Sequence, residues 1–156
     1  MMDAQIQFSD RQSDIDFYQL QQLFNISAFW AQERNLEDLR LAVTNSDPVV
    51  TVWKHQRLIG FARATSDCVY RATIWDVIIH PEYRGLGLGS KLVETVLSHP
   101  RIHRVERVYL MTTHQQDFYQ KIGFQVNSST TMVLYNQSQI QPLPVNETKL
   151  PESIGG

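Results

Sequence analysis

Alternating glycines in the run Arg84-Gly85-Leu86-Gly87-Leu88-Gly89 are the residues best suited to chemistry in this sequence. An apolar run, Val77-Ile78-Ile79, precedes them, and apolar residues at helical spacing follow from Leu88 to Leu97, so the glycines join a strand to a helix. The first N–H groups of a helix have no internal partner and lie at the positive end of its dipole. Glycine removes the Cβ atoms that keep an anion away, and Arg84 adds a positive charge. The run therefore predicts a binding site for phosphate.

Other phosphate-binding motifs do not fit this run. The sequence has no Gly-x-x-x-x-Gly-Lys followed by Ser or Thr, and the spacing of Gly85, Gly87 and Gly89 differs from the Gly-x-Gly-x-x-Gly of dinucleotide-binding folds. A second interpretation is a turn that only joins the strand to the helix. Because each glycine costs conformational entropy on folding, three alternating glycines favour the phosphate interpretation.

The elements that must position this loop follow from the spacing of apolar residues. Alternating or β-rich stretches predict strands, and apolar residues three and four apart predict helices. Asp16 (with Ser13) and Asn35 are suited to cap the first two helices, and Gly123 is suited to end the last one. The predicted order is strand 4–8, a helix carrying residues 17–24, a helix after Asn35, strands 49–53, 58–64 and 72–79, helix 88–97, a strand over 105–110, helix 115–122, and strands 124–126 and 131–135.

This order predicts an α/β (α+β) fold in a single domain, with a mixed central sheet of six to seven strands and helices on both faces. The length of 156 residues, with 42% hydrophobic and 19% charged side chains, suits one core. We assign residues 1–136 to this domain. Residues 137–156 contain three prolines, few large apolar residues and no periodicity, and they are predicted to form a flexible tail.

Charge and cysteine content argue against several classes of function. The net charge of −2 gives no long-range attraction for nucleic acid or an acidic membrane. Cys68 is the only cysteine, so an intramolecular disulfide and a Cys/His zinc site are excluded, and no metal is expected. The sequence has no apolar run of ~20 residues and no signal-peptide pattern. We therefore expect a cytoplasmic protein, or a stromal one if it is plastid-encoded, with neither nucleic acid nor membrane as a partner.

Two linked motifs resemble the GNAT superfamily of acetyltransferases. The first is Arg84-x-x-Gly87-x-Gly89 after a strand that ends at His80-Pro81, and the second is Phe118-Tyr119-x-x-x-Gly123-Phe124. Within the superfamily, residues 60–67 together with residues 72–77 resemble the plastid and cyanobacterial branch. That branch includes chloroplast protein acetyltransferases and enzymes described as serotonin N-acetyltransferases. The resemblance covers residues 48–126 well and the N-terminal helices only by layout.

The resemblance implies an acyltransferase that uses acetyl-CoA as cosubstrate and transfers acetyl to a primary amine by direct attack. The pantetheine arm is expected to pair with the backbone of Val77, Ile78 and Ile79, in a slot where the sheet opens between its fourth and fifth strands. The pyrophosphate is expected on the loop, at Arg84, Gly85, Leu86, Gly87, Leu88, Gly89 and Ser90.

Roles for the catalytic residues also follow from the resemblance. The backbone N–H of Val77, at a bulge in the strand, is the expected donor to the oxyanion. Tyr119 is the candidate acid for the departing thiolate, with a core aromatic as its alternative role. Many family members carry Asn or Asp seven residues before the tyrosine, where this sequence has Thr112, which cannot act as a base.

The general base therefore stays open. Asp76, His80, His114 and a chain of waters are the candidates, and we name Asp76 as the catalytic candidate among them. An anchor for a neighbouring loop is the alternative role for Asp76, and His80 and His114 are expected at the surface.

The acceptor amine also stays open. A lysine side chain or N-terminal amine of a protein is the first hypothesis, a small arylalkylamine such as serotonin is the second, and a non-catalytic acyl-CoA-binding sensor, motivated by Thr112, is the third. A protein acceptor predicts an open groove over Trp75 and Asp76. A small aromatic amine predicts a closed pocket lined by Phe29 or Trp30. The protein is expected to be a monomer or a homodimer.

Overall fold

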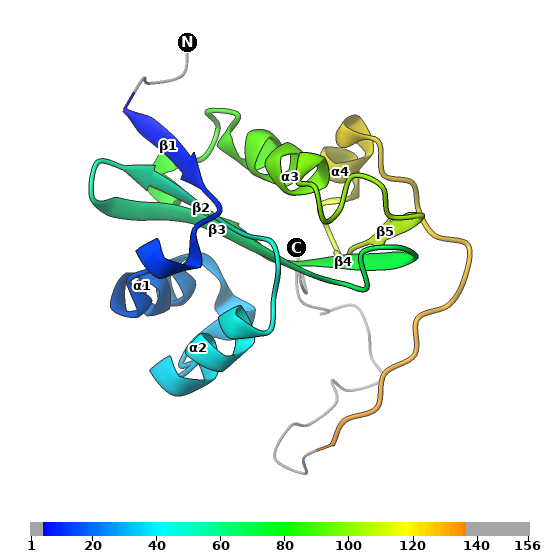
Figure 1. Cartoon of the computed structure of the whole chain (residues 1–156), viewed down its shortest axis with the longest axis horizontal. Coiled ribbons are helices and arrows are strands. Elements are labelled where there is room, and N and C mark those ends of the chain that lie inside the picture. Colours follow the sequence, from blue (N-terminus) through cyan, green and yellow to red (C-terminus); the bar gives the residue numbers. More distant parts are fainter. Residues whose placement is uncertain (1–4, 137–156) are drawn as a thin grey trace.

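Five strands form the central sheet of the computed structural model, which describes residues 5–136 (Figure 1). They lie in the order of the sequence, with antiparallel pairing from the first to the fourth and parallel pairing of the last two. The strands are β1 (Ile6–Ser9), β2 (Val49–Lys54), β3 (Arg57–Ser66), β4 (Arg71–Ile79) and β5 (Arg107–Tyr109). The mixed sheet confirms the predicted α/β class.

Helices cover both faces of this sheet, as predicted (Figure 1). The first pair begins at the predicted caps: Asp16 accepts hydrogen bonds from the N–H groups of Tyr18 and Gln19, and Asn35 accepts one from Asp38. The α-helices are α1 (Phe17–Ser27), α2 (Leu36–Thr44), α3 (Leu88–Ser98) and α4 (Gln116–Ile122). Three short 3₁₀ turns lie between these elements: η1 (Gln12–Asp14) between β1 and α1, η2 (Phe29–Ala31) between α1 and α2, and η3 (Pro81–Tyr83) between β4 and α3.

Two apolar clusters lie on opposite faces of the sheet. On one face, α1 and α2 pack against β2, β3 and Ile78 of β4. On the other face, α3 and α4 pack against β2, β3 and Ile74 and Ile79 of β4. Because Ile78 and Ile79 belong to different clusters, the end of β4 is covered on both sides, as its apolar sequence predicted.

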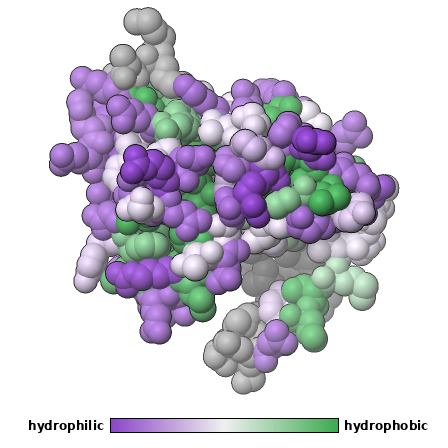
Figure 2. Space-filling model, viewed as in Figure 1, coloured by the Kyte–Doolittle hydropathy of each residue, from purple (hydrophilic) through white to green (hydrophobic). Residues whose placement is uncertain are grey.

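The sheet has fewer strands than the six to seven predicted. Residues 124–126 and 131–135, which were predicted to be strands, are not strands in the structure. A strand needs a neighbouring edge for its backbone hydrogen bonds, and β5 contributes only three residues. The side chains of Met132 and Leu134 are 91% and 83% exposed, and Figure 2 shows the hydrophobic atoms gathered on this segment.

The predicted flexible tail, residues 137–156, lies outside the described residues. Between residues 5 and 136, no helix has both the length and the apolar character needed to cross a membrane.

Candidate active site

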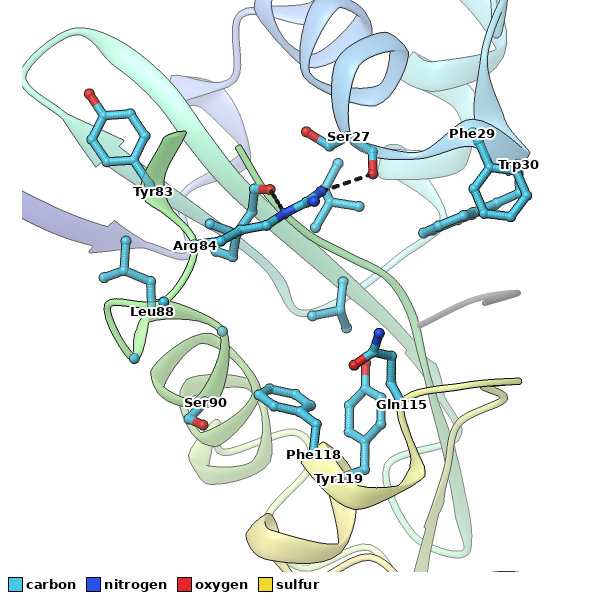
Figure 3. A pocket seen from close by; sticks show the side chains of 16 residues that line it. Ser27, Phe29, Trp30, Tyr83, Arg84, Leu88, Ser90, Gln115, Phe118 and Tyr119 are labelled. Atoms are coloured by element: carbon cyan, nitrogen blue, oxygen red, sulfur yellow. Dashed lines mark hydrogen bonds between the residues drawn. The ribbon is translucent and has the colours of Figure 1, made fainter. Parts of the chain in front are cut away.

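A cleft of about 510 Å³ lies between the end of β4, the start of α3, α4 and the turn after α1 (Figure 3). This volume is within the usual range of small-molecule sites. Most of the lining comes from the region that the glycine run predicted. The lining residues are Ser27, Phe29, Trp30, Val77, Ile78, Ile79, Tyr83, Arg84, Gly85, Gly87, Leu88, Gly89, Ser90, Gln115, Phe118 and Tyr119.

The sheet opens along this cleft. Pairing between β4 and β5 runs from Arg71 with Arg107 to Thr73 with Tyr109, and β4 then continues alone on that side to Ile79. The last part of β4 therefore presents an edge without a neighbouring strand among residues 5–136. Such an edge offers N–H and C=O groups to an extended ligand, as the predicted slot requires.

A β-bulge interrupts β4 beside the cleft. Phe61 pairs with Ile78 and Arg63 with Trp75, so the two residues Asp76 and Val77 lie opposite Ala62 alone. Asp76 has a positive φ of 57°, in the left-handed region. The extra residue reverses the alternation of side chains, and Val77 consequently lines the cleft. The bulge itself is where the resemblance implied it.

The glycine loop leaves the first amides of α3 available to a ligand. Gly85 and Gly87 have φ values of 81° and 80°, and Gly87 is the N-cap of α3 without a side-chain capping bond. The N–H of Lys91 is the first in the helix to bond a carbonyl within this turn, that of Gly87. The amides of Leu88, Gly89 and Ser90 precede it and are the orphan donors expected at a helix start. They line the cleft at an electropositive helix end.

Gly89 has a different structural role from the other two glycines. A Cβ placed on Gly89 would lie 3.3 Å from Cζ of Phe118, whereas Cβ atoms on Gly85 and Gly87 would meet nothing within 4 Å. Gly89 therefore lets the Phe118 ring of α4 approach α3 closely. The sequence interpretation attributed all three glycines to phosphate binding and missed this contact.

The Arg84 side chain is hydrogen-bonded to two of the elements that line the cleft. Figure 3 shows its guanidinium donating to the backbone carbonyl of Ser27, at the end of α1, and to that of Ile79, at the end of β4. A guanidinium has five N–H donors, so three remain for an anion. Leu86, by contrast, does not line the cleft, and its side chain is 60% exposed.

Tyr119 lies at the opposite wall, on α4 (Figure 3). Its side chain is 4% exposed and packs edge-on against Phe118 and Phe124. This burial raises the pKa of the Tyr119 hydroxyl above the ordinary value of a phenol, because the charged phenolate is poorly solvated there. The hydroxyl is therefore protonated at neutral pH and can serve as a proton donor.

Asp76 lies outside the cleft lining. Its carboxylate is buried and accepts hydrogen bonds from Nε of Arg63 at 2.7 Å and from Nη1 of Arg34 at 3.2 Å. A base must reach the proton that it removes, and two guanidinium groups occupy this carboxylate. The geometry favours the anchoring role of Asp76, while its role as a base stays a prediction.

The histidines named as candidate bases do not line the cleft. His80 was expected at the surface, but it is buried, and its Nδ1 accepts the N–H of Glu82 at the start of η3. Burial and the positive charge of Arg57 lower the pKa of His80. His114 is exposed, as expected. Thr112 accepts the N–H of Gln115 through its hydroxyl and does not line the cleft.

The aromatic candidates for acceptor binding separate into two groups. Phe29 and Trp30 line the cleft, with their rings edge to face and Phe29 51% exposed. Trp75 does not line it and instead donates from its indole N–H to the Thr65 hydroxyl.

Sequence reasoning also missed several lining residues. Ser27, Tyr83, Gln115 and Phe118 had no assigned place in the site. The sequence could have indicated Phe118 and Gln115, because Phe118 is next to Tyr119 on α4 and Gln115 is the N-cap of that helix. The sequence could not have indicated Ser27, because only tertiary contact brings the end of α1 to Arg84.

Comparisons with known proteins agree with this geometry. The profile of the acetyltransferase (GNAT) family matches residues 14–124. The chain is 43% identical over 115 residues to an uncharacterized N-acetyltransferase, ycf52-like, of Prochlorococcus marinus, covering 70% of this chain and 63% of that protein. It is 36% identical over 135 residues to GCN5-related N-acetyltransferase 2, chloroplastic, of Arabidopsis thaliana, covering 73% and 52%.

A third relative is named for its acceptor. Histone acetyltransferase TAP1 of Glycine max is 36% identical over 126 residues, covering 73% of this chain and 54% of that protein. The chain thus spans between about half and two thirds of the length of these relatives.

Solved structures share the fold. A crystal structure from Xanthomonas campestris, described as belonging to the GNAT family, superposes with a TM-score of 0.73 at 25% identity, covering 83% of this chain and 93% of that one. Naa50 of Arabidopsis thaliana, in complex with the bisubstrate analogue CoA-Ac-MVNAL, gives a TM-score of 0.62 at 19% identity, covering 80% and 86%. The second likeness is one of fold alone.

Proposed function

This chain belongs to the GNAT family of acetyltransferases, and on that premise we propose that it transfers acetyl from acetyl-CoA to a primary amine of a protein. The observation that carries the proposal is the continuous path from the free edge of β4 at Val77 to the orphan amides at the start of α3. Tyr119 lies across the same cleft.

The residues present fit acetyl-CoA. Val77, Ile78 and Ile79 offer backbone groups to the pantetheine amides, and the amides of residues 88–90 face the position of a pyrophosphate. Gly85 and Gly87 leave open space around their Cα atoms, so a phosphate can approach the backbone. The three N–H groups of Arg84 that are not bound to carbonyls can add charge-assisted bonds. The CoA moiety of the ligand bound to Naa50 supports this choice of cosubstrate.

When bound, acetyl-CoA supplies an activated acetyl thioester. The Val77 N–H, turned by the bulge, donates a hydrogen bond to the acetyl carbonyl oxygen, where negative charge grows as the amine attacks. The Tyr119 hydroxyl gives its proton to the sulfur as the carbon–sulfur bond breaks, and it regains a proton from the nitrogen that forms the new amide. Because its pKa is raised, Tyr119 keeps the proton until the sulfur becomes basic. Positioning of the neutral amine supplies much of the remaining acceleration.

A protein lysine or N-terminal amine is the acceptor that we propose first. The cleft is open at its rim, where Phe29 is half exposed, so a chain can reach it from the surface. The relative named as a histone acetyltransferase supports a protein acceptor. We place the reaction in the cytoplasm or the plastid stroma, and the relative named as chloroplastic supports the second location.

An arylalkylamine is the second candidate acceptor, and one specific observation favours it. Phe29 and Trp30 line the cleft, whereas Trp75 and Asp76, over which a groove for a protein was expected, do not. An aromatic amine can stack against the faces or edges of these two rings. The aromatic lining thus matches the pocket expected for a small amine, but the open rim does not match the closed shape expected of that pocket.

Thiol release from acetyl-CoA tests both candidates. The purified full chain is incubated with a lysine peptide, a peptide with a free N-terminus, serotonin or no acceptor, and the acetylated product is identified by mass spectrometry. Release that depends on a peptide amine supports the first proposal, and release that depends on serotonin alone replaces it with the second. Binding of acetyl-CoA without amine-dependent release supports the non-catalytic sensor.

Phe29→Ala provides the matched variant. Phe29 is half exposed, so we expect little loss of stability and a rise in KM for an aromatic amine of about tenfold. For a peptide amine we expect a smaller change. Leu41→Ala is the control, because Leu41 is also exposed but lies on α2 and does not line the cleft.

A further inference from the structure

One carboxylate oxygen, Oδ2 of Asp76, is shared by two arginines from distant parts of the chain. Arg63 belongs to β3 and contacts it at 2.7 Å, and Arg34 lies just before α2 and contacts it at 3.2 Å. The side chains of Asp76 and Arg63 are 5% and 19% exposed, and that of Arg34 is 36% exposed. A buried carboxylate that loses such a partner is left with an uncompensated charge, so the three groups act as a unit.

This unit holds the bulge that places Val77. Asp76 has left-handed backbone angles, which a residue other than glycine adopts at a cost that its surroundings must offset. Arg63 pairs with Trp75 on the neighbouring strand, directly before the bulge, and its guanidinium reaches across to the Asp76 carboxylate. It also donates to the Ser46 hydroxyl. The ion pair therefore fixes Asp76 on the face of the sheet that α1 and α2 cover.

The alternation of side chains along β4 shows how the bulge changes the face of the sheet to which Val77 points. Ala72 and Ile74 pack with the cluster under α3 and α4, and so do Val77 and Ile79. An uninterrupted strand starting at Ala72 would instead turn residues 77 and 79 toward α1 and α2. The bulge at Asp76 is therefore what directs Val77 to the cleft.

Arg34 connects the same carboxylate to the acceptor wall, the part of the cleft lining formed by Phe29 and Trp30. It follows the turn that carries Phe29 and Trp30, and its guanidinium lies 5.0 Å from the ring centre of Phe24 on α1. Its backbone carbonyl accepts a hydrogen bond from Gln21 on α1. The segment between α1 and α2 is thus tied to the bulge through Asp76.

We propose that Asp76, Arg63 and Arg34 form a positioning network that couples the acceptor wall to the oxyanion donor. Arg63 and Asp76 hold the Val77 N–H in place for turnover, and Arg34 holds the wall formed by Phe29 and Trp30 in place for acceptor binding. The inference rests on the proposed function. In this network, none of the three side chains touches the reacting atoms.

Steady-state kinetics on the full chain test the network, with acetyl-CoA affinity measured separately by calorimetry. For Asp76→Asn and Arg63→Lys we expect kcat to fall by about 10- to 100-fold with an acetyl-CoA Kd within about twofold of wild type. For Arg34→Gln we expect KM for the amine to rise about tenfold with a smaller change in kcat. Arg40→Gln is the control, because Arg40 also lies over an aromatic ring on this side of the sheet but makes no bond to Asp76.

A general base at Asp76 gives a different pattern. In that case Asp76→Asn removes the rising limb of the pH profile of kcat/KM, whereas Arg63→Lys and Arg34→Gln leave turnover nearly intact. In the network, Asp76→Asn and Arg63→Lys lower turnover alike and keep the shape of the profile. The first pattern overturns the proposal.

A double-mutant cycle between Arg34→Gln and Asp76→Asn measures the coupling directly. We expect the combined change in kcat/KM to be smaller than the product of the single changes, and independent effects overturn the link to the acceptor wall. Arg34 is partly exposed, so its variant keeps the test valid if Arg63→Lys does not fold. If wild-type protein binds no acetyl-CoA, the proposed function itself fails. If it binds and turns over but the variants behave as wild type, only the network fails.

Discussion

Nε of Arg84 donates to the carbonyl oxygen of Ile79 at 3.1 Å, so the first residue of the glycine run is bound to the last residue of β4. A second bond, from Nη2 to the Ser27 carbonyl at 3.3 Å, ties the same side chain to the end of α1. Arg84 thus closes the junction between strand and loop as well as offering charge to an anion. These two functions have different requirements, since only a guanidinium supplies several donors in a fixed plane.

Arg84→Lys separates the shape of the side chain from its charge. We expect the acetyl-CoA Kd to rise about tenfold, because lysine keeps the charge but cannot bond both carbonyls and an anion. Calorimetric titration with acetyl-CoA measures the change. Arg71→Lys is the control: it alters an exposed ion pair with Glu106 and should leave the affinity as in wild type. An unchanged Kd in Arg84→Lys contradicts the bridging role.

Gly87→Ala tests the glycine loop against a matched glycine. Gly87 and Gly123 both have positive φ values, and a Cβ on either meets nothing within 4 Å. We expect each alanine variant to lose roughly 1–2 kcal/mol of stability through backbone strain. Only Gly87→Ala should also weaken acetyl-CoA binding, by about tenfold, because only Gly87 lines the cleft. Thermal unfolding and calorimetry together check the prediction, and equal affinities in the two variants rule it out.

Tyr119→Phe tests the proton donor. The change removes one oxygen atom from a buried ring that packs against Phe118 and Phe124, so the fold should persist. We expect kcat to fall by about 100-fold or more, the usual effect of losing a general acid, with little change in the acetyl-CoA Kd. Amine-dependent thiol release measures the rate. A turnover equal to that of wild type removes Tyr119 from the mechanism.

The lowered pKa of His80 predicts how the free energy of unfolding depends on pH. Its pKa lies below the ordinary value of 6.5, chiefly because burial disfavours the charged imidazolium. As the pH falls below about 6.5, the unfolded chain therefore binds a proton at His80 more readily than the folded chain, and the free energy of unfolding decreases. Well above that pH, His80 is neutral in both states and contributes no pH dependence.

Urea denaturation at several pH values between 7.5 and 5.5 measures this effect. His80→Asn serves as the comparison, since asparagine can still accept the N–H of Glu82 but does not titrate. We expect wild type to lose more stability than the variant over this range. Parallel curves for the two proteins exclude His80 as a source of the pH dependence.

Much of the fold was predictable because its cues are local. Asp16 and Asn35 cap the helices that they were predicted to cap, and the apolar end of β4 is buried on both faces. The predictions failed at residues 124–126 and 131–135, where alternation indicates a strand but the short β5 is the nearest edge. Strand formation depends on a partner, and a single segment does not report whether that partner is available.

The sequence by itself determined the glycine loop, because positive φ values and a helix start depend on residues a few positions apart. The sequence indicated Tyr119 through the family resemblance, and its role as the acid stays a prediction. Only the tertiary structure decided what surrounds them. Asp76 meets Arg63 and Arg34 from 13 and 42 residues away, and Arg84 meets Ser27 from 57 residues away. Hydrogen bonds of this kind act over a few ångströms between atoms that only the folded chain brings together, so no local pattern in the sequence records them.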